Sequence, residues 1–436
     1  MPGRVPAALR RARSAASARP HLPARLRSRR SRALVFLGLL GPGLIAANAG
    51  NDAGGIATYS EVGAKYGYTL LWAMLLITVS LALVQRAAAR MGTVTGKGLA
   101  ELIRERYGIR WSAFATLAVL VANLGICISD FIGVGAALGL AGIPAQVTVP
   151  VAALGIWLII VRGSYRSAER VFVWMTIPFF AYPVAAILAK PDWGQVGHAL
   201  VVPQLHTDPT FLLLFVAMAG TTITPYMQLY LQSAVVERGS TEADLPAETR
   251  EAVGGAVFAD VVAAFIIIAT GATLYVAGTH SIGSAADAAK ALEPLAGQYA
   301  ELLFGVGLLG ASLLAAAILP IATSYVVAES LGFEKGIGRR TEEAPVFVGL
   351  ITAMIVISTV VAVIPGVPVI SLLIGVQVVN GVLLPINLGF VWRLARSEEL
   401  MGEHRNRGPV DWVTAATVAL TSTLSLILVA VTLLGL

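Results

Sequence analysis

Apolar runs long enough to cross a membrane follow one another along this chain, from Ala33 to its last residue. A transmembrane helix needs about 20 apolar residues to cross roughly 30 Å of hydrocarbon. Of the 436 residues, 57% are hydrophobic and 13% are charged, and an ordinary soluble domain does not have this composition. The sequence therefore predicts an all-α polytopic membrane protein whose membrane portion, 33–436, is one domain in a lipid bilayer.

The apolar runs divide into about eleven transmembrane helices. Between Trp111 and Val161 the only charge is Asp130, yet the run exceeds one span, so a turn is expected near Gly142-Ile143-Pro144. The same reasoning divides 344–392 at Pro365-Gly366-Val367-Pro368. The predicted spans are 33–60, 67–89, 111–140, 144–161, 171–189, 209–236, 252–278, 302–328, 344–364, 368–392 and 411–435.

The net charge of +6 has a local source, because the tail 1–32 holds ten arginines and no acid. Such a tail beside a first span is typical of a disordered cytoplasmic segment that sets topology, so no nucleic-acid partner is expected. With the N-terminus in the cytoplasm, every Lys and Arg except Lys65, Lys190 and Lys290 falls on the cytoplasmic side. An odd number of spans then leaves the C-terminus outside a multi-pass protein of the cell membrane.

Two predicted spans are interrupted by helix-breaking residues. The first contains Asn48-Ala49-Gly50-Asn51-Asp52-Ala53-Gly54-Gly55, and the sixth contains Gly220-Thr221-Thr222-Ile223-Thr224-Pro225-Tyr226. Opened backbone persists in a bilayer only where it lines a protein-enclosed polar cavity. Broken helices five spans apart are typical of inverted-repeat transporters, which bind their ligand at the midplane. Two kinks that serve only packing are the alternative interpretation.

Three acids lie in the interior of the predicted spans, Asp52, Asp130 and Asp260, and no Lys, Arg or His occupies a span interior. A charge at the bilayer centre costs a few kcal/mol, so a diffusible cation is the natural partner for at least one acid. Asp52 is the best candidate, with backbone carbonyls near Ala49 as further ligands. Asp130 belongs either to a proton or water path or to a local hydrogen bond. Asp260 is expected near the cytoplasmic end of its span, in a vestibule or in packing.

Gln377 and Asn380 lie one turn apart in the tenth predicted span and form a polar stripe. Amide hydrogen bonds between helices would explain this stripe. A carbonyl oxygen turned towards a cation is the second interpretation. The histidines all fall outside the spans, and the only cysteine, Cys127, excludes a disulfide framework.

Short motifs follow one another along the whole membrane portion: Gly41-Pro42-Gly43, Asp52-Ala53-Gly54-Gly55, 63–68, 70–72, 90–97, Tyr230-Leu231-Gln232-Ser233-Ala234, Gln377-Val378-Val379, Leu384-Pro385 and Leu400-Met401-Gly402. In this order they resemble the Nramp divalent-metal transporters. The resemblance implies a LeuT-type fold of five plus five inverted spans and an eleventh. The two repeats would cover about 33–190 and 209–393, and the eleventh span about 411–435.

The sequence departs from the typical family pattern at the expected metal site. Members read Asp-Pro-Gly-Asn in the first span, where this chain has Gly55 in place of the amide ligand. Their Met-Pro-His in the sixth span is replaced by Thr224-Pro225-Tyr226, with one extra residue before Tyr230. Of the glutamates that flank the acid of the third span, one aligns with Asn123 and one with Gly133. The thioether, the imidazole and two titratable carboxylates are thus missing.

These departures resemble the NRAMP-related magnesium transporters, which are understood to carry Mg²⁺ and Mn²⁺ without proton coupling. Oxygen ligands without sulfur favour hard ions, and Gly55 is expected to leave room for an ion that keeps several waters. The implied metal site consists of Asp52, Ala49, Gly55, Thr221, Thr224 and Gln377. Asp130 and Tyr226 are the candidates for a proton or water path.

Two other functions stay open from sequence. One is a proton-coupled Mn²⁺ or Fe²⁺ importer that uses Asp130 alone. The other is a LeuT-fold carrier of amino acids or organic solutes, although Asp52 would repel a substrate carboxylate at the broken helix. No nucleophile and base pair or sizeable extramembrane domain points to an enzyme. No cofactor is expected beyond the transported ion, and the chain is expected to be a monomer.

Overall fold

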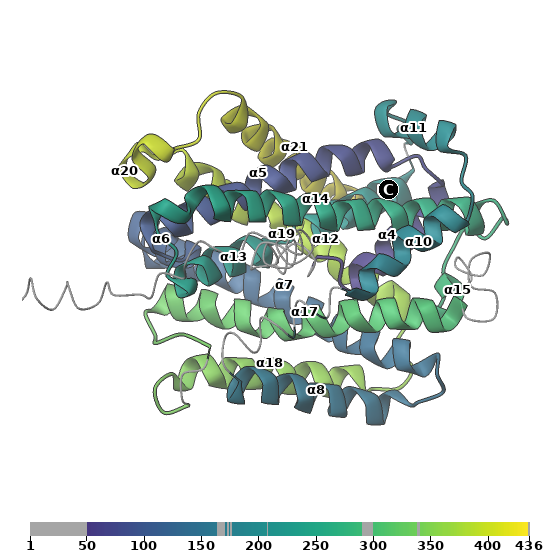
Figure 1. Ribbon diagram of the computed structural model, residues 1–436, viewed down its shortest axis with the longest axis horizontal. Helices are drawn as coiled ribbons and strands as arrows, with labels where there is room; N and C mark the ends of the chain where they lie inside the picture. The colour runs from purple at the N-terminus through teal and green to yellow at the C-terminus, as the bar shows by residue number, and fades with distance from the viewer. Residues whose placement is uncertain are drawn as a thin grey trace, which may run out of the picture. The chain divides into compact units, whose positions relative to one another are not determined.

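The computed structural model describes residues 50–163, 171, 174, 177–206, 208–289, 300–337 and 341–434, which belong to the unit Leu40–Leu436 (Figure 1). Every regular element in these residues is a helix, and they contain no strand. The predicted all-α fold is therefore confirmed. The Arg-rich tail 1–32 and the first part of the first span lie outside the described residues.

Helices long and apolar enough to cross a membrane match nine of the eleven predicted spans. The other two predictions, 33–60 and 171–189, fall partly on residues that the structure does not describe. Their described parts are α4 (Ala53–Tyr66) and, for the second, η1 (Ile177–Phe180) with α10 (Ala181–Leu188). The nine candidate spans are Leu71–Thr95, Ile109–Gly139, Ala145–Arg162, Pro209–Arg238, Glu242–Tyr275, Leu302–Leu331, Pro345–Ala362, Val369–Ala395 and Pro409–Val431.

Both turns that were placed inside long apolar runs are present. The first separates α7 (Ile109–Gly139) from α8 (Ala145–Arg162), and the second separates α18 (Pro345–Ala362) from α19 (Val369–Ala395). Each turn contains a glycine with positive φ, +78° at Gly142 and +83° at Gly366, and glycine adopts this conformation without steric cost. In Figure 1, α8 and α18 lie side by side.

The break in the sixth span is confirmed. Helix α12 (Pro209–Thr222) stops two residues before α13 (Pro225–Arg238) begins. Pro225 occupies the first turn of α13, where its missing N–H removes no helical hydrogen bond. On the other side of the site, α4 begins directly after Asp52. Two helix N-termini, those of α4 and α13, therefore lie inside the membrane portion.

The seventh span begins earlier than predicted, because α14 runs from Leu245 to Thr270 and continues into the π-helical turn η3 (Gly271–Tyr275). Pro246 fits the first turn of this helix and does not end it. Asp260 lies near the middle of this long helix, but the charged residues of its first turns precede the apolar stretch, so its expected place near the cytoplasmic end of the span stays a prediction. Its side chain is buried, which is consistent with a packing role.

Three helix pairs frame the broken segments: α17 (Ala300–Leu331) with α7, α14 with α5 (Leu71–Thr95), and α12 with α19 (Figure 1). Helix α4 contacts α7, α12, α14 and α19, so its first turn lies where these helices meet. The remaining elements are α6 (Leu99–Tyr107), α11 (Trp193–Val201), η2 (Glu242–Asp244), α15 (Ala285–Ala289), α20 (Glu398–Met401), η6 (Gly402–His404) and α21 (Pro409–Leu434).

Helices α12 and α19 approach each other to backbone contact through two glycines. A Cβ atom on Gly220 would lie 2.4 Å from both the Gln377 carbonyl oxygen and the Gly381 nitrogen. A Cβ atom on Gly381 would lie 2.5 Å from the Val216 carbonyl oxygen. Close backbone approach through small residues is typical of membrane helix pairs, and here it brings Gln377 beside the break in the sixth span.

Candidate functional site

Asp52 caps the N-terminus of α4. Its carboxylate accepts a hydrogen bond of 2.5 Å from the Gly55 amide, and the residue is 1% exposed. A carboxylate at this position satisfies a backbone N–H that has no helical partner and interacts favourably with the helix dipole. The acid singled out from sequence is therefore held at a fixed point of the break.

Gln377 of α19 faces Asp52 across the site. Its Nε2 atom donates to both carboxylate oxygens of Asp52, at 3.0 and 2.9 Å. Its Oε1 atom is buried and has no hydrogen-bond partner among the described residues. The structure thus brings together two predicted site residues that lie 325 positions apart in sequence.

Oxygen atoms from three residues converge beside Gly55. A Cβ atom at this glycine would lie 2.8 Å from the Gly50 carbonyl, 2.8 Å from Thr221 Oγ1 and 3.2 Å from Asp52 Oδ1. The Thr221 hydroxyl donates to the Gly50 carbonyl at 3.1 Å. The space beside Gly55 was expected to hold a hydrated ion, but in this conformation these oxygens fill it. The missing side chain lets the oxygens come together.

Two carbonyl groups at the end of α12 accept hydrogen bonds from side chains outside that helix. The Thr224 hydroxyl donates to the Thr221 carbonyl at 2.7 Å, and Asn380 Nδ2 donates to the Gly220 carbonyl at 2.6 Å. Asn380 therefore makes an amide hydrogen bond between α19 and α12, which was the first of the two interpretations of the polar stripe. Thr224 reaches the broken segment, where its hydroxyl oxygen keeps lone pairs that can accept a further contact.

Asp130 of α7 lies at the same helix terminus as Asp52. Its Oδ1 atom accepts a hydrogen bond of 3.2 Å from the Ala53 amide, while its Oδ2 atom is buried without a hydrogen-bond partner among the described residues. The two carboxylates are near enough to repel each other. Asp130 therefore belongs to the same polar cluster, and its hydrogen bond is to a helix start and not to a neighbouring hydroxyl.

The two positions that flank Asp130 carry no titratable group. Asn123 donates from Nδ2 to Thr323 Oγ1 at 2.8 Å and so joins α7 to α17. A Cβ atom on Gly133 would lie 2.5 Å from both Ala53 Cβ and Ser312 Oγ. A larger side chain at residue 133 therefore has no room in this packing.

Tyr226 and Ala49 are the remaining residues predicted for the site. Tyr226 is buried in the first turn of α13, within electrostatic reach of Asp52 and Asp130. Ala49 lies outside the described residues.

Residues that were not singled out from sequence anchor the break to its neighbours. Asn51 donates from Nδ2 to the Ala259 carbonyl of α14 at 2.8 Å. The Tyr59 hydroxyl hydrogen-bonds Thr222 Oγ1 at 2.8 Å and joins α4 to the end of α12. Tyr59 lies seven residues, about two turns, after Asp52, so helical spacing alone places both on one face of α4.

The resulting site joins two buried carboxylates, several oxygen atoms and an amide. No Lys, Arg or His side chain among the described residues is seen to hydrogen-bond Asp52 or Asp130. Buried carboxylates are costly unless a cation or hydrogen bonds compensate them. The arrangement can therefore hold a cation at the junction of α4, α12 and α19.

Comparison with known sequences gives matches over most of the chain. The sequence model of a family described as Nramp, natural resistance-associated macrophage protein-like, matches residues 43–431. The divalent metal cation transporter MntH of Yersinia pestis (strain Pestoides F) is 31% identical over 310 residues, covering 69% of this chain and 75% of that protein. MntH of Deinococcus radiodurans is 30% identical over 310 residues, covering 68% and 70%.

Comparison with solved structures gives the fold. The Eremococcus coleocola manganese transporter, crystallised with an aromatic bis-isothiourea compound, superposes with a TM-score of 0.72 at 21% identity and covers 92% of this chain and 88% of that chain. MhsT in complex with L-phenylalanine gives a TM-score of 0.60 at 13% identity, covering 89% and 97%. The LeuT-type fold expected from sequence is therefore confirmed.

Proposed function

This chain belongs to the Nramp family and is a multi-pass divalent metal cation transporter, and from that premise we propose that it imports Mg²⁺, together with Mn²⁺, by alternating access and without proton coupling. Its relatives are metal ion transporters and not enzymes. In the proposed site Asp52 is the charged ligand. Gln377, Thr221, Thr224 and the Ala49 carbonyl supply oxygen, and Gly55 supplies close backbone approach.

The groups that surround Asp52 support a hard ion as the substrate. Its neighbours are the Gly55 amide, the Gln377 amide and the Thr221 hydroxyl. Thr224 and Pro225 occupy the break where typical members of the family carry the thioether. Carboxylate, hydroxyl and carbonyl oxygens suit Mg²⁺ and Mn²⁺, whereas thioether sulfur favours softer metals.

Ion binding requires a local rearrangement in this proposal. Gln377 presents Nε2 to Asp52, and an N–H donor cannot ligate a cation, so the amide turns to offer its unpartnered Oε1. The Thr221 hydroxyl leaves the Gly50 carbonyl, which frees two more oxygens. Mg²⁺ usually keeps several waters and takes one or two carboxylates, so this donor set is sufficient.

The residues around Asp130 support transport without protons. A proton path needs a succession of titratable groups, and Asn123 and Gly133 flank this acid. Uptake does not require protons energetically. At −100 mV a divalent cation gains about 4.6 kcal/mol on entry, from about 2.3 kcal/mol per charge. That energy corresponds to accumulation on the order of a thousandfold.

Proteoliposomes loaded with a Mg²⁺-sensitive dye and a pH-sensitive dye test the proposal. We expect Mg²⁺ to enter without acidification, Mn²⁺ to compete with it, and Asp52→Ala to abolish the flux. Asp260→Asn is the matched control, because it removes a buried carboxylate from α14 and leaves the break intact. Acidification in proportion to Mn²⁺ entry would instead favour a proton-coupled importer that uses Asp130.

The alternative of an organic solute has its own test. Calorimetric binding of an amino acid that survives Asp52→Ala would favour it over a metal ion. We further propose that the protein is a monomer of the cell membrane, with a cytoplasmic Arg-rich tail 1–32 and an external C-terminus. The repeats 33–190 and 209–393 and the eleventh span 411–435 complete this proposed organisation.

A further inference from the structure

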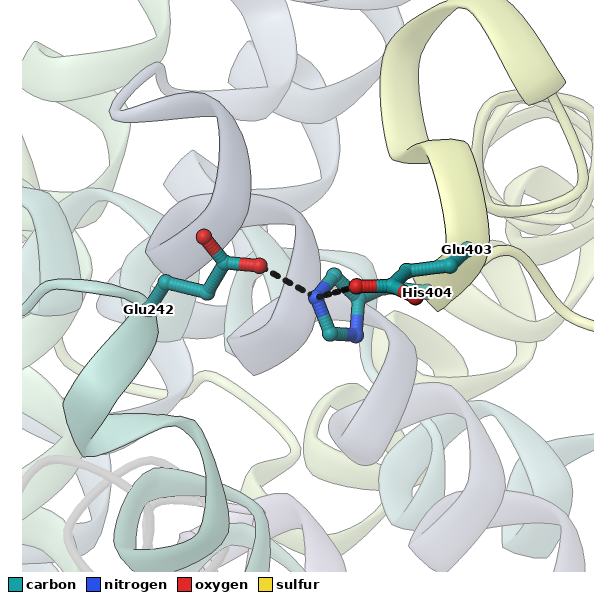
Figure 2. Close-up of side chains that lie close together, drawn as sticks. All are labelled: Glu242, Glu403 and His404. Atoms are coloured by element: carbon teal, nitrogen blue, oxygen red, sulfur yellow. Dashed lines mark hydrogen bonds and ion pairs between the residues drawn. The ribbon is translucent and has the colours of Figure 1, made fainter.

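A histidine and two glutamates come together outside the Asp52 site. Glu242 belongs to η2, which follows α13, and Glu403 and His404 belong to η6, which follows α20. One ligand atom from each of the three lies within 4.8 Å of the others. Figure 2 shows the two carboxylates approaching the same imidazole nitrogen from different sides. His404 Nε2 lies 2.5 Å from Glu242 Oε1 and 3.9 Å from Glu403 Oε1.

Both segments that carry this histidine–glutamate cluster are held in place by their own hydrogen bonds. A capping box fixes η2, in which the Asp244 carboxylate accepts from the Thr241 amide and hydroxyl at 2.9 Å. After η6, the backbone N–H of Asn406 donates to the Ala395 carbonyl at 2.8 Å, and the Arg90 guanidinium donates to the Asn406 side-chain Oδ1 at 3.0 Å. The cluster thus forms where two anchored loops contact each other, and its residues Glu242 and His404 lie 162 positions apart in sequence.

The cluster carries a net negative charge that a bound cation would offset. With a neutral imidazole its net charge is −2, and with a protonated imidazole it is −1. The neighbouring Arg405 is engaged by Glu398. Imidazole nitrogen together with carboxylate oxygen is a common ligand set for Zn²⁺ and other first-row transition metals, whereas Mg²⁺ prefers oxygen alone.

We propose that Glu242, Glu403 and His404 form a binding site for a divalent transition metal such as Zn²⁺ or Mn²⁺, separate from the transport site and not used by Mg²⁺. Ligands at about 2.0–2.2 Å from zinc stand roughly 3 to 3.5 Å from one another. The 2.5 Å separation must therefore open and the 3.9 Å separation close, each by about 1 Å or less, and the two carboxylate oxygens, which lie within 4.8 Å of each other, must reach the same spacing. Glu242 and Glu403 are 65% and 87% exposed, so their side chains are free to make this adjustment, and water completes the coordination.

A metal at this site would act on transport, a consequence that rests on the proposed function. Segment η2 follows α13, whose first turn lies at the break, and η6 lies beyond α19, which carries Gln377. Alternating access moves helical groups against each other around the binding site. An ion that ties these two loops together restrains that motion. In the proposed topology the loops face the cytoplasm, where imported metal accumulates, so the bound metal slows further uptake.

Calorimetry on the purified full-length protein tests the binding. The protein carries Asp52→Ala to disable the transport site, and any histidine tag is removed. We expect one Zn²⁺ per chain and no heat from Mg²⁺. His404→Ala or Glu242→Gln in this background should weaken Zn²⁺ binding at least about tenfold, or about 1.4 kcal/mol. Glu399→Gln, which removes an α20 acid paired with Arg106, should leave it unchanged.

Separate results would overturn the metal site and its effect on transport. Equal Zn²⁺ affinity with and without His404, or no Zn²⁺ binding at all, leaves the cluster as an ion pair. The transport consequence is tested with Mg²⁺ flux in proteoliposomes, where Zn²⁺ should slow the wild type and not His404→Ala. Equal slowing of both overturns the restraint. Lack of Mg²⁺ flux in the wild type would sink the proposed function while the binding result stood.

Discussion

Asp52 combines two roles that would normally be assigned to different residues. As the N-cap of α4 it stabilises a helix start, and as a buried carboxylate it is the natural ligand for a cation. The roles use different properties of the side chain, since capping needs an oxygen acceptor and cation binding needs charge. Substitution can therefore separate them.

Replacing Asp52 with asparagine should abolish transport and spare folding. Asn caps helices about as well as Asp, so we expect a melting temperature within about 2 °C of the wild type. Loss of the only charged ligand should lower Mg²⁺ flux at least about tenfold. Flux in proteoliposomes and melting in detergent measure the two effects. Wild-type flux in Asp52→Asn would show that the carboxylate serves only as a cap.

Gly55 is the second position at which a small change should have a large effect. Gly55→Ala places a methyl group 2.8 Å from the Gly50 carbonyl and from Thr221 Oγ1, so the oxygens beside Asp52 must separate. Overpacking of this kind costs about 1–3 kcal/mol, and we expect a lower melting temperature together with reduced flux.

The control for Gly55→Ala is Gly349→Ala in α18, where an added Cβ meets no atom within 4 Å. That change should leave transport intact and stabilise the helix by about 0.5–1 kcal/mol. If Gly55→Ala behaved like Gly349→Ala, the oxygens beside Gly55 would not be needed in their present positions.

Between elements, the start of α12 is tied to the end of α4. The Tyr66 hydroxyl donates to Asp208 Oδ1 at 2.6 Å, and Asp208 also caps α12 through the Phe211 amide. The hydrogen bond from Tyr66 holds the pKa of Asp208 below its ordinary value of 3.8. This contact joins α4 and α12 at their ends away from Asp52.

The pKa of Asp208 gives the contact a defined pH dependence. Because the folded pKa is depressed, its stabilisation is fully present above about pH 3.8 and is lost as pH falls through the folded value. Tyr66→Phe should lower the melting temperature at pH 7 by about 2 °C or less, because the pair is exposed. That difference should disappear in strong acid.

Melting curves of the wild type and Tyr66→Phe in detergent, from pH 7 down into strong acid, test this dependence. The matched control is Tyr107→Phe, whose ring packs against Phe390. Its effect on the melting temperature should not change with pH. A Tyr66→Phe difference that persisted below the folded pKa would show that ring packing, and not the hydrogen bond to Asp208, carries the contact.

Elements marked by strong local signals were predictable from sequence. Pro225 in a polar stretch predicted the break between α12 and α13, and the turns at 142–144 and 365–368 followed from run length. Pairings across the fold were not. Nothing local indicates that the Gln377 amide donates to Asp52, because their contact depends on the packing of α4 against α19. The start of α14 at Leu245 was not predicted, because its charged first turns do not resemble a membrane span.

On the scale of the whole molecule, the distribution of Lys and Arg fixes the proposed orientation. Cytoplasmic loops carry an excess of these residues, and in the proposed topology all but three fall on the cytoplasmic side. The loop between α13 and α14 is then cytoplasmic, and the segment between η3 and α15 is external. The histidine–glutamate cluster and the metal entry side both depend on this orientation.

Labelling of introduced cysteines by a membrane-impermeant maleimide tests the orientation in intact cells. The single native cysteine, Cys127, is buried, so the wild type should give no background. Ser281 lies exposed beyond η3 and Ala243 lies exposed in η2, so each accepts a cysteine without loss of packing. Ser281→Cys should react in intact cells, whereas Ala243→Cys should react only after permeabilisation, because the proposed topology puts them on opposite faces. The reverse pattern would invert the topology and place the histidine–glutamate cluster on the side from which metal enters.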